Sequence, residues 1–178
     1  MTFNDSEPYV MALGSMVMMA ASLEKVVAEY LVCLAVDAGE SAEAERDAYL
    51  GESGQMLTKR LRHRGRGELA DHLDALFGDR NHLVHGEAWI LPGNEGADWK
   101  LYSRKKGAAM VQAVWTPAQI LGLRDDCAKL AGRLFHQVSR HNNGGMPEAF
   151  TLVGSQGPVI PSPRKKFTEA SDAAVALV

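Results

Sequence analysis

The sequence predicts an all-α fold with a small β-hairpin before the last helix, and three observations support this. Apolar residues recur at intervals of three and four in the stretches 8–37, 68–86 and 117–141, as in helices with one buried face. Glycine or proline stands near the ends of these stretches, where helices start and stop. Before the last stretch, a Pro-Gly-Asn-Glu-Gly sequence separates two short runs typical of strands.

Composition and length indicate an ordinary globular protein, with 46% hydrophobic and 23% charged residues in 178. No uninterrupted apolar run approaches the roughly 20 residues that span a bilayer, so we expect no membrane association. The first ten residues lack the basic start and apolar stretch of a secretory signal. We therefore expect a cytoplasmic protein.

The chain is long enough for one sizeable core and short for two. We expect a helical domain over residues 1–141, in which about 87–115 form the hairpin insertion. The remainder, residues 142–178, is rich in Asn-Gly and Pro-Ser punctuation with little periodicity, which predicts a flexible tail.

The first predicted helix, from Pro8 to about Asp37, has a very wide apolar arc. Its polar residues form only a narrow strip, whereas a helix covered on one side needs a broad polar face. We therefore expect cover on two sides, by its own domain and by a second copy of the chain. The arc comprises Tyr9, Val10, Ala12, Leu13, Met16, Val17, Met19, Leu23, Val26, Val27, Tyr30, Leu31 and Leu34.

Shorter elements complete the prediction. Residues 40–52 are acidic and rich in alanine, and Ser53 then caps a short helix that Gly65 and Gly67 end. The strands are expected at 87–91 and 99–104, with a possible third at 110–115. Thr116-Pro117 caps the last helix, which runs to about His141.

Two charged residues stand at positions where the pattern predicts burial. Arg80 falls in the middle of the apolar stripe of the third long stretch, and Glu24 takes a heptad position that Val10, Val17 and Leu31 otherwise fill. A buried guanidinium without a partner costs several kcal/mol, so Arg80 should meet a carboxylate or face an anion-binding cleft. We expect Glu24 to lie near Arg80.

The segment Arg80-Asn81-His82-Leu83-Val84-His85, near the end of a helix in a helical chain, resembles the Arg-x-x-x-x-His motif of the HEPN superfamily. The match includes the polar residue that often follows the arginine, here Asn81. The resemblance covers the helical order from about residue 8 to 141, with the hairpin as an insertion and the tail outside it.

The resemblance implies a four- to five-helix bundle that pairs two-fold and cuts RNA at the dimer cleft without metal or another cofactor. It implies catalytic roles for Arg80, Asn81 and His85, with Glu24 supporting. Histidine exchanges protons near neutral pH, and the arginine fork binds phosphate oxygens. The resemblance also implies a toxin or phage-defence endoribonuclease, with an antitoxin protein as a possible partner.

A second hypothesis belongs to a different class of protein. In it the chain is a catalytically inactive helical module for interaction or RNA binding. Arg80 and Glu24 then form a structural pair, and His85 caps the helix end, where a partly positive imidazole is favoured.

A basic run just before the motif helix is the candidate RNA-binding surface. Clustered arginine and lysine suit the phosphate backbone, although such runs are often solvated loops balanced by nearby acids, here Glu40 to Asp47. The run comprises Lys59, Arg60, Arg62, His63, Arg64 and Arg66.

The remaining ligand-type residues predict no metal site. His82 and His85 are three residues apart but lack a supporting carboxylate or third histidine in their helix. Cys33 and Cys127 lie far apart in apolar helical patterns, which indicates reduced thiols in the core.

Overall fold

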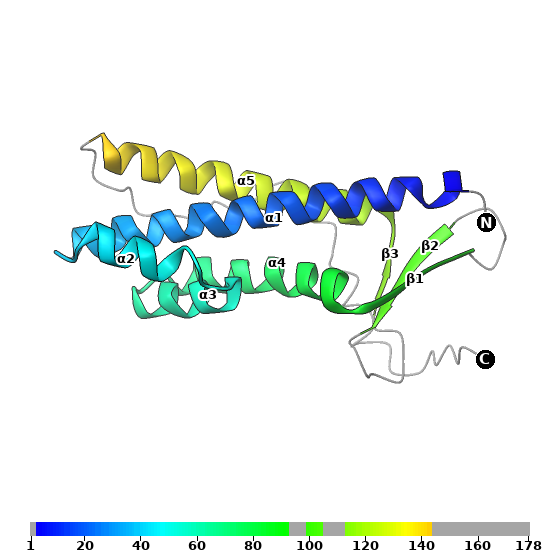
Figure 1. The fold of residues 1–178 in the computed structure, drawn as a ribbon, viewed down its shortest axis with the longest axis horizontal. Coiled ribbons are helices and arrows are strands. Elements are labelled where there is room, and N and C mark those ends of the chain that lie inside the picture. Colours follow the sequence, from blue (N-terminus) through cyan, green and yellow to red (C-terminus); the bar gives the residue numbers. More distant parts are fainter. Residues whose placement is uncertain (1–2, 93–98, 105–112, 144–178) are drawn as a thin grey trace. The chain divides into compact units, whose positions relative to one another are not determined.

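The computed structural model describes residues 3–92, 99–104 and 113–143, and the chain is mainly helical, as predicted (Figure 1). Five helices and three strands follow one another within these residues. The helices are α1 (Phe3–Asp37), α2 (Ala42–Tyr49), α3 (Gly54–His63), α4 (Gly67–His85) and α5 (Pro117–Asn142); the strands are β1 (Glu87–Pro92), β2 (Trp99–Arg104) and β3 (Ala113–Trp115).

The chain divides into two compact units, which are described separately. In the described residues, the first unit holds 3–17, 78–92, 99–104 and 113–124, and the second holds 18–77 and 125–143. The helices α1, α4 and α5 contribute residues to both. Most of the predicted tail, 144–178, and the predicted turn lie outside the described residues.

The first unit contains the antiparallel sheet β1-β2-β3. This confirms the predicted hairpin and the possible third strand. Its buried residues include Leu83 of α4, Leu101 of β2, Trp115 of β3 and Ile120 of α5. The start of α5 is a capping box: Thr116 Oγ1 accepts from the Gln119 N–H, and Gln119 Oε1 accepts from the Thr116 N–H at 2.8 Å. These reciprocal bonds explain why the helix begins where the sequence predicts.

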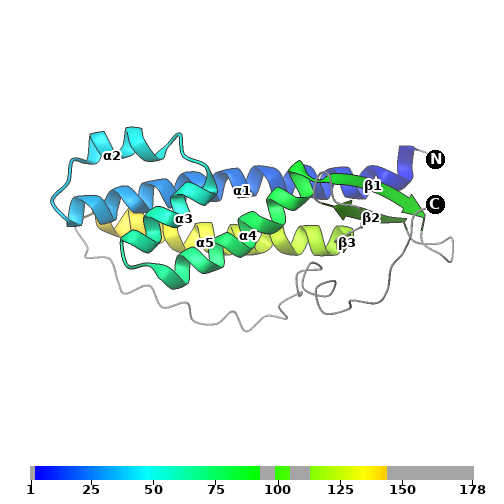
Figure 2. The same ribbon diagram turned by 90° about the horizontal axis from the view of Figure 1, so that it is seen from below.

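The second unit is helical, and Figure 2 shows α3 beside the first half of α4 and α2 beside α1. Its core joins apolar residues of all five helices. The side chains buried there include Leu23, Val27, Tyr30, Leu31, Tyr49, Leu57, Leu61, Leu69, Leu73, Phe77, Cys127, Leu130, Leu134 and Val138. Both cysteines are buried thiols, which confirms the prediction for them. Burial, followed by the charges of Glu29 and Asp37, raises the pKa of Cys33.

Two glycines end helices in this unit by the same backbone device. Gly39, with φ +83°, follows α1, and Gly65, with φ +72°, follows α3. In each case the glycine N–H bonds three residues back, and a later N–H bonds five residues back: Glu40 to Ala35 O at 3.0 Å and Arg66 to Leu61 O at 2.8 Å. This Schellman arrangement needs a residue in the left-handed backbone conformation, which only glycine adopts readily.

The helix α2 was missed by the sequence analysis, which left residues 40–52 unassigned. Ser41 caps it, with its side chain accepting from Ala44 N, and Tyr49 is its buried residue. Arg46 connects it to α1 through a bidentate ion pair with Glu29. Arg46 Nε and Nη2 each donate to one Glu29 carboxylate oxygen at 3.1 Å. Because this tie joins distant parts of the sequence, local periodicity could not reveal the helix.

The exposed surface of α1 differs from the sequence expectation. Val10 was placed on the apolar arc but is 60% exposed, and Met11 and Met18 are exposed as well. By length and composition Glu7–Asp37 could also cross a membrane, so the argument that no stretch reaches that length is wrong for α1. Core helices of soluble proteins pass the same test, and the cellular location stays a prediction.

Gly54 provides a test of the packing between α3 and α4. A Cβ at this position would come within 2.6 Å of the ring of buried Phe77. We expect Gly54→Ala to lower the free energy of unfolding by about 1–3 kcal/mol, the usual cost of overpacking. Gly132→Ala is the control, since nothing lies within 4 Å there and alanine favours a helix interior. Equal effects of the two variants in urea unfolding would contradict this packing.

Candidate active site at the end of α4

The last two turns of α4 carry the motif residues. Leu83, which is buried in the first unit, fixes the orientation of this end of the helix. Arg80 and Asn81 are half-buried, and His85 is exposed at the last helical position. Val84, expected in the buried stripe, is 39% exposed, which is a correction to the prediction. Val84 is seven residues after Phe77, so helical spacing places it on the apolar face of the helix.

Arg80 and Asn81 are joined through their side chains. Arg80 Nη1 donates to Asn81 Oδ1 at 2.7 Å. An asparagine amide has one acceptor oxygen and two N–H donors. With its oxygen directed to Arg80, Asn81 turns its side-chain N–H donors away from the guanidinium.

Asn81 also lies between Arg80 and the helix face that carries His85. Residues four apart in a helix are about 40° apart around the axis, so Asn81 and His85 share a face. Arg80 and His85, five apart, are separated by about 140° on the same count. The bond between Arg80 and Asn81 therefore brings the guanidinium toward the side of the helix that carries the imidazole.

The junction between α4 and the sheet is set by Gly86. A Cβ on Gly86 would lie 2.8 Å from the carbonyl oxygen of Arg104 and closer still to that of His82. The end of β2 thus presses against the end of α4, with no room for a side chain between them. Glu87, the first residue of β1, pairs in register with Arg104, and Arg104 Nε donates to Glu87 Oε2 at 2.7 Å.

Arg104 and Glu87 are residues that the sequence analysis did not assign to the site. Arg104 is the last residue of β2, and its backbone lies against Gly86, the residue that follows the motif helix. The signal that places it there is strand register, which a single sequence does not determine.

Glu24 lies on α1 and is half-buried. It belongs to the second unit, whereas Arg80 belongs to the first. The expected proximity of Glu24 and Arg80 therefore stays a prediction.

Several arginines of the basic run are engaged by carboxylates within the second unit. Arg60 pairs with Glu52 at 2.9 Å, and its guanidinium carbon lies 5.7 Å from the centre of the Tyr49 ring. Arg64 pairs with both carboxylate oxygens of Glu40. These contacts reduce the local positive charge, because each guanidinium is matched by a carboxylate. Lys59 is exposed and Arg66 half-buried.

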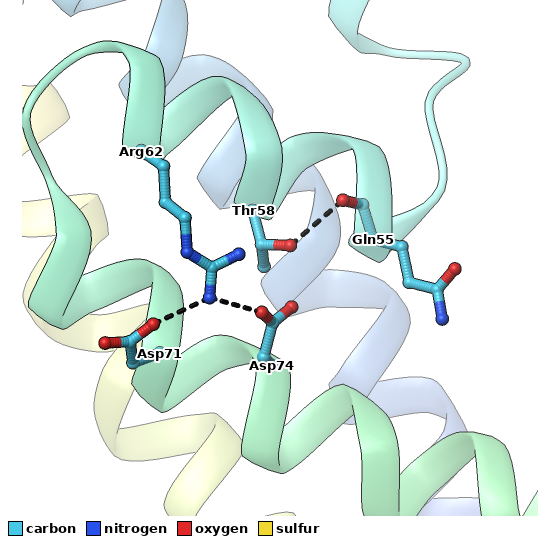
Figure 3. A network of polar contacts seen from close by, with 5 residues as sticks. All are labelled: Gln55, Thr58, Arg62, Asp71 and Asp74. Atoms are coloured by element: carbon cyan, nitrogen blue, oxygen red, sulfur yellow. Dashed lines mark hydrogen bonds and ion pairs between the residues drawn. The ribbon is translucent and has the colours of Figure 1, made fainter.

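Arg62 has the most extended network of the run, drawn in Figure 3. Its Nη2 lies 2.6 Å from Asp71 Oδ1 and 2.5 Å from Asp74 Oδ2, bridging α3 to two residues one turn apart on α4. The hydroxyl of buried Thr58 donates to Gln55 O at 2.9 Å beside it. Burial alone would raise the pKa of Asp74, but the hydrogen bond and positive charge of Arg62, together with the nearby Thr58 hydroxyl, outweigh burial and lower the pKa.

In the described part of the chain, no group of three or more His, Cys, Asp or Glu side chains is placed to hold a metal ion. The chemistry that the motif offers comes from imidazole, guanidinium and amide groups.

Asp74 gives a pH-dependent prediction. A carboxyl with a lowered pKa stabilises the fold when ionised, so its contribution is present above about pH 4 and is lost as pH falls further. We expect Asp74→Asn to destabilise the protein at pH 7, with the difference from wild type shrinking toward pH 3. The control Asp71→Asn removes the more exposed partner and should cost less. A pH-independent difference in urea unfolding would rule out this role of the Asp74 charge.

No protein-family model, no curated protein and no solved structure matches the chain significantly. The function is therefore argued from the motif and from the geometry of its residues.

Proposed function

We propose that the protein is a metal-independent endoribonuclease with a HEPN-like fold, of the toxin or phage-defence type, acting in the cytoplasm. The observation that carries the proposal is the arrangement on α4: exposed His85 shares a helix face with Asn81, and Asn81 is bonded to Arg80. A proton-transfer group and anion-binding donors thus come from one short segment.

The chemistry that suits these groups is attack by a ribose 2′-hydroxyl on the adjacent phosphorus. The 2′-oxygen forms a bond to phosphorus, the bond from phosphorus to the 5′-oxygen breaks, and the products are a 2′,3′-cyclic phosphate and a 5′-hydroxyl. His85 takes the 2′-hydroxyl proton and a proton is delivered to the leaving oxygen. Arg80 and the Asn81 N–H groups stabilise the negative charge that develops on the phosphoryl oxygens.

A homodimer is part of the proposal. Val10 and Met11 of α1, in the first unit, are 60% and 68% exposed, and Met18 of α1, in the second unit, is 74% exposed. Exposed apolar surface on a helix favours cover by another helix, and a second copy supplies an identical surface. Two-fold pairing would bring two motif histidines to one cleft, one to accept the proton and one to donate it.

The alternative is a non-catalytic helical module, and one observation favours it. Arg60, Arg62 and Arg64 of the candidate RNA-binding surface are each paired with carboxylates of the chain itself. Binding of a phosphate backbone has to compete with these pairs. The alternative predicts no turnover by protein that is folded.

Replacing His85 tests the proposed chemistry. We expect His85→Ala to slow RNA cleavage by about 10²- to 10⁴-fold, the usual contribution of general acid–base catalysis. The assay incubates wild type and variant with RNA in a chelator and detects fragments ending in 2′,3′-cyclic phosphate. His72→Ala is the matched control, since His72 is an exposed histidine earlier in the same helix. Intact RNA with folded wild-type protein would support the interaction module instead.

Replacing Arg80 separates a catalytic from a structural role. If Arg80 serves the reaction, Arg80→Ala should reduce cleavage about 10²-fold or more, as loss of a transition-state donor does. Because Arg80 is half-buried and bonded to Asn81, the variant's free energy of unfolding should then fall by no more than about 1 kcal/mol, the usual effect of a single substitution. A loss of several kcal/mol in urea unfolding would identify Arg80 as a structural residue and contradict its assignment to the site.

A further inference from the structure

The sheet of the first unit has two unlike faces. On one face Leu101 and Ser103 of β2 and Ala113 and Trp115 of β3 are buried, and they pair across the two strands. Trp115 Nε1 donates to Ser103 Oγ at 2.9 Å, so the polar atoms of this face are satisfied inside it. This face is the packed side of the sheet.

The opposite face follows from the alternation of strand residues. It carries Tyr102 and Arg104 of β2, Glu87 of β1 and Val114 of β3, all of them partly exposed. The exposed fractions of the Arg104 and Glu87 side chains are 31% and 37%. An aromatic ring and a guanidinium therefore stand two residues apart on one strand, accessible to solvent.

This face lies beside the motif because of the junction at Gly86. The backbone of Arg104 abuts the end of α4 there, and Glu87, which holds Arg104, is two residues from His85. Arg104 is therefore the nearer of the two residues to the exposed His85, and Tyr102 follows two positions further along β2. Both parts belong to the first unit.

We propose that Tyr102 and Arg104 form a binding site for single-stranded RNA next to His85. The inference rests on the proposed ribonuclease function and specifies its substrate class. Arg104 contacts a phosphate adjacent to the one that is cut, and Tyr102 stacks on a base. The two side chains are separated by about 7 Å along the strand, a distance comparable to one nucleotide step of an extended single strand.

Glu87 acts as a positioning residue in this site. Its carboxylate oxygen Oε2 accepts a hydrogen bond from the Arg104 Nε–H at 2.7 Å. This bond restricts the Arg104 side chain before binding, so less conformational entropy is lost when the arginine contacts a phosphate. The carboxylate also offsets the arginine charge, so the affinity should depend on stacking as well as on charge.

The preference for a single strand has a physical reason. Stacking on a tyrosine ring requires a base whose face is exposed, and bases in a duplex are covered by their neighbours. A strand platform with an aromatic and a basic residue can accept any base, since every base has a π-face. The site therefore selects unpaired RNA without demanding one sequence.

The test measures binding of a fluorescein-labelled RNA octanucleotide to full-length protein carrying His85→Ala, so that cleavage does not interfere. We expect Tyr102→Leu to weaken binding about tenfold with an unchanged salt dependence, as loss of one stacked base does. We expect Arg104→Ala to weaken it and to reduce the slope of log K against log salt by about 0.7, the value for one phosphate of a single strand.

Matched variants separate contact from structure. Tyr102→Phe keeps the ring and should bind as the parent does, and Arg104→Lys keeps the charge and should retain the salt slope. Arg46→Ala, which removes an ion-paired arginine of α2, should leave both affinity and slope unchanged. A duplex of the same sequence should bind at least tenfold more weakly.

The outcomes distinguish the inference from the proposed function. If wild type cleaves RNA but Tyr102→Leu and Arg104→Ala bind the octanucleotide like the parent, the sheet-face site is refuted and the nuclease stands. If those variants lose binding while wild type does not cleave, the site stands and catalysis is refuted. Absence of both cleavage and binding by folded protein overturns both, and equal binding of duplex and single strand overturns the substrate class.

Discussion

The arrangement around the motif depends on the lack of a side chain at Gly86. A helix and a strand meet there so closely that a Cβ would collide with the carbonyl oxygens of His82 and Arg104. Because the helix ends at His85 and β1 begins at Glu87, this contact sets which strand residue faces the motif. The cross-strand pair of Glu87 and Arg104 and the exposed position of His85 both follow from it.

The arginines of α2 and α3 and the motif residue Arg80 have different surroundings. Those of α2 and α3 join neighbouring elements of the second unit through carboxylates, as Arg46 does with Glu29 and Arg62 with Asp71 and Asp74. Such exposed pairs contribute little stability one by one, but they fix the register of short helices that bury few apolar residues. Arg80 instead donates to the side-chain amide of Asn81 in its own helix.

The sequence predicted the helices with strong boundary signals and long apolar periods. The last helix was located by Thr116-Pro117, and the end of the first by Gly39, which follows it. The predicted start of the first helix at Pro8 is wrong, because α1 begins at Phe3. The helix α2 was not predicted. Its cap, Ser41, lies next to it in the sequence, but the ion pair that holds it against α1 joins Arg46 to Glu29, 17 residues away. Likewise, the motif could be read from six consecutive residues, whereas the place of Arg104 beside it depends on strand pairing. The exposure of Val10 and Val84 shows that helical periodicity assigns a face without saying whether anything covers it.

The burial of both native thiols has a practical consequence for experiments on this molecule. A thiolate is the species that reacts with maleimides, and Cys33 is buried with a raised pKa, while Cys127 is fully enclosed. A cysteine introduced on the exposed surface would therefore react much faster than either native thiol. Fluorophores or spin labels can be attached at a chosen position without first removing the native cysteines, so distances between the two units become measurable in solution.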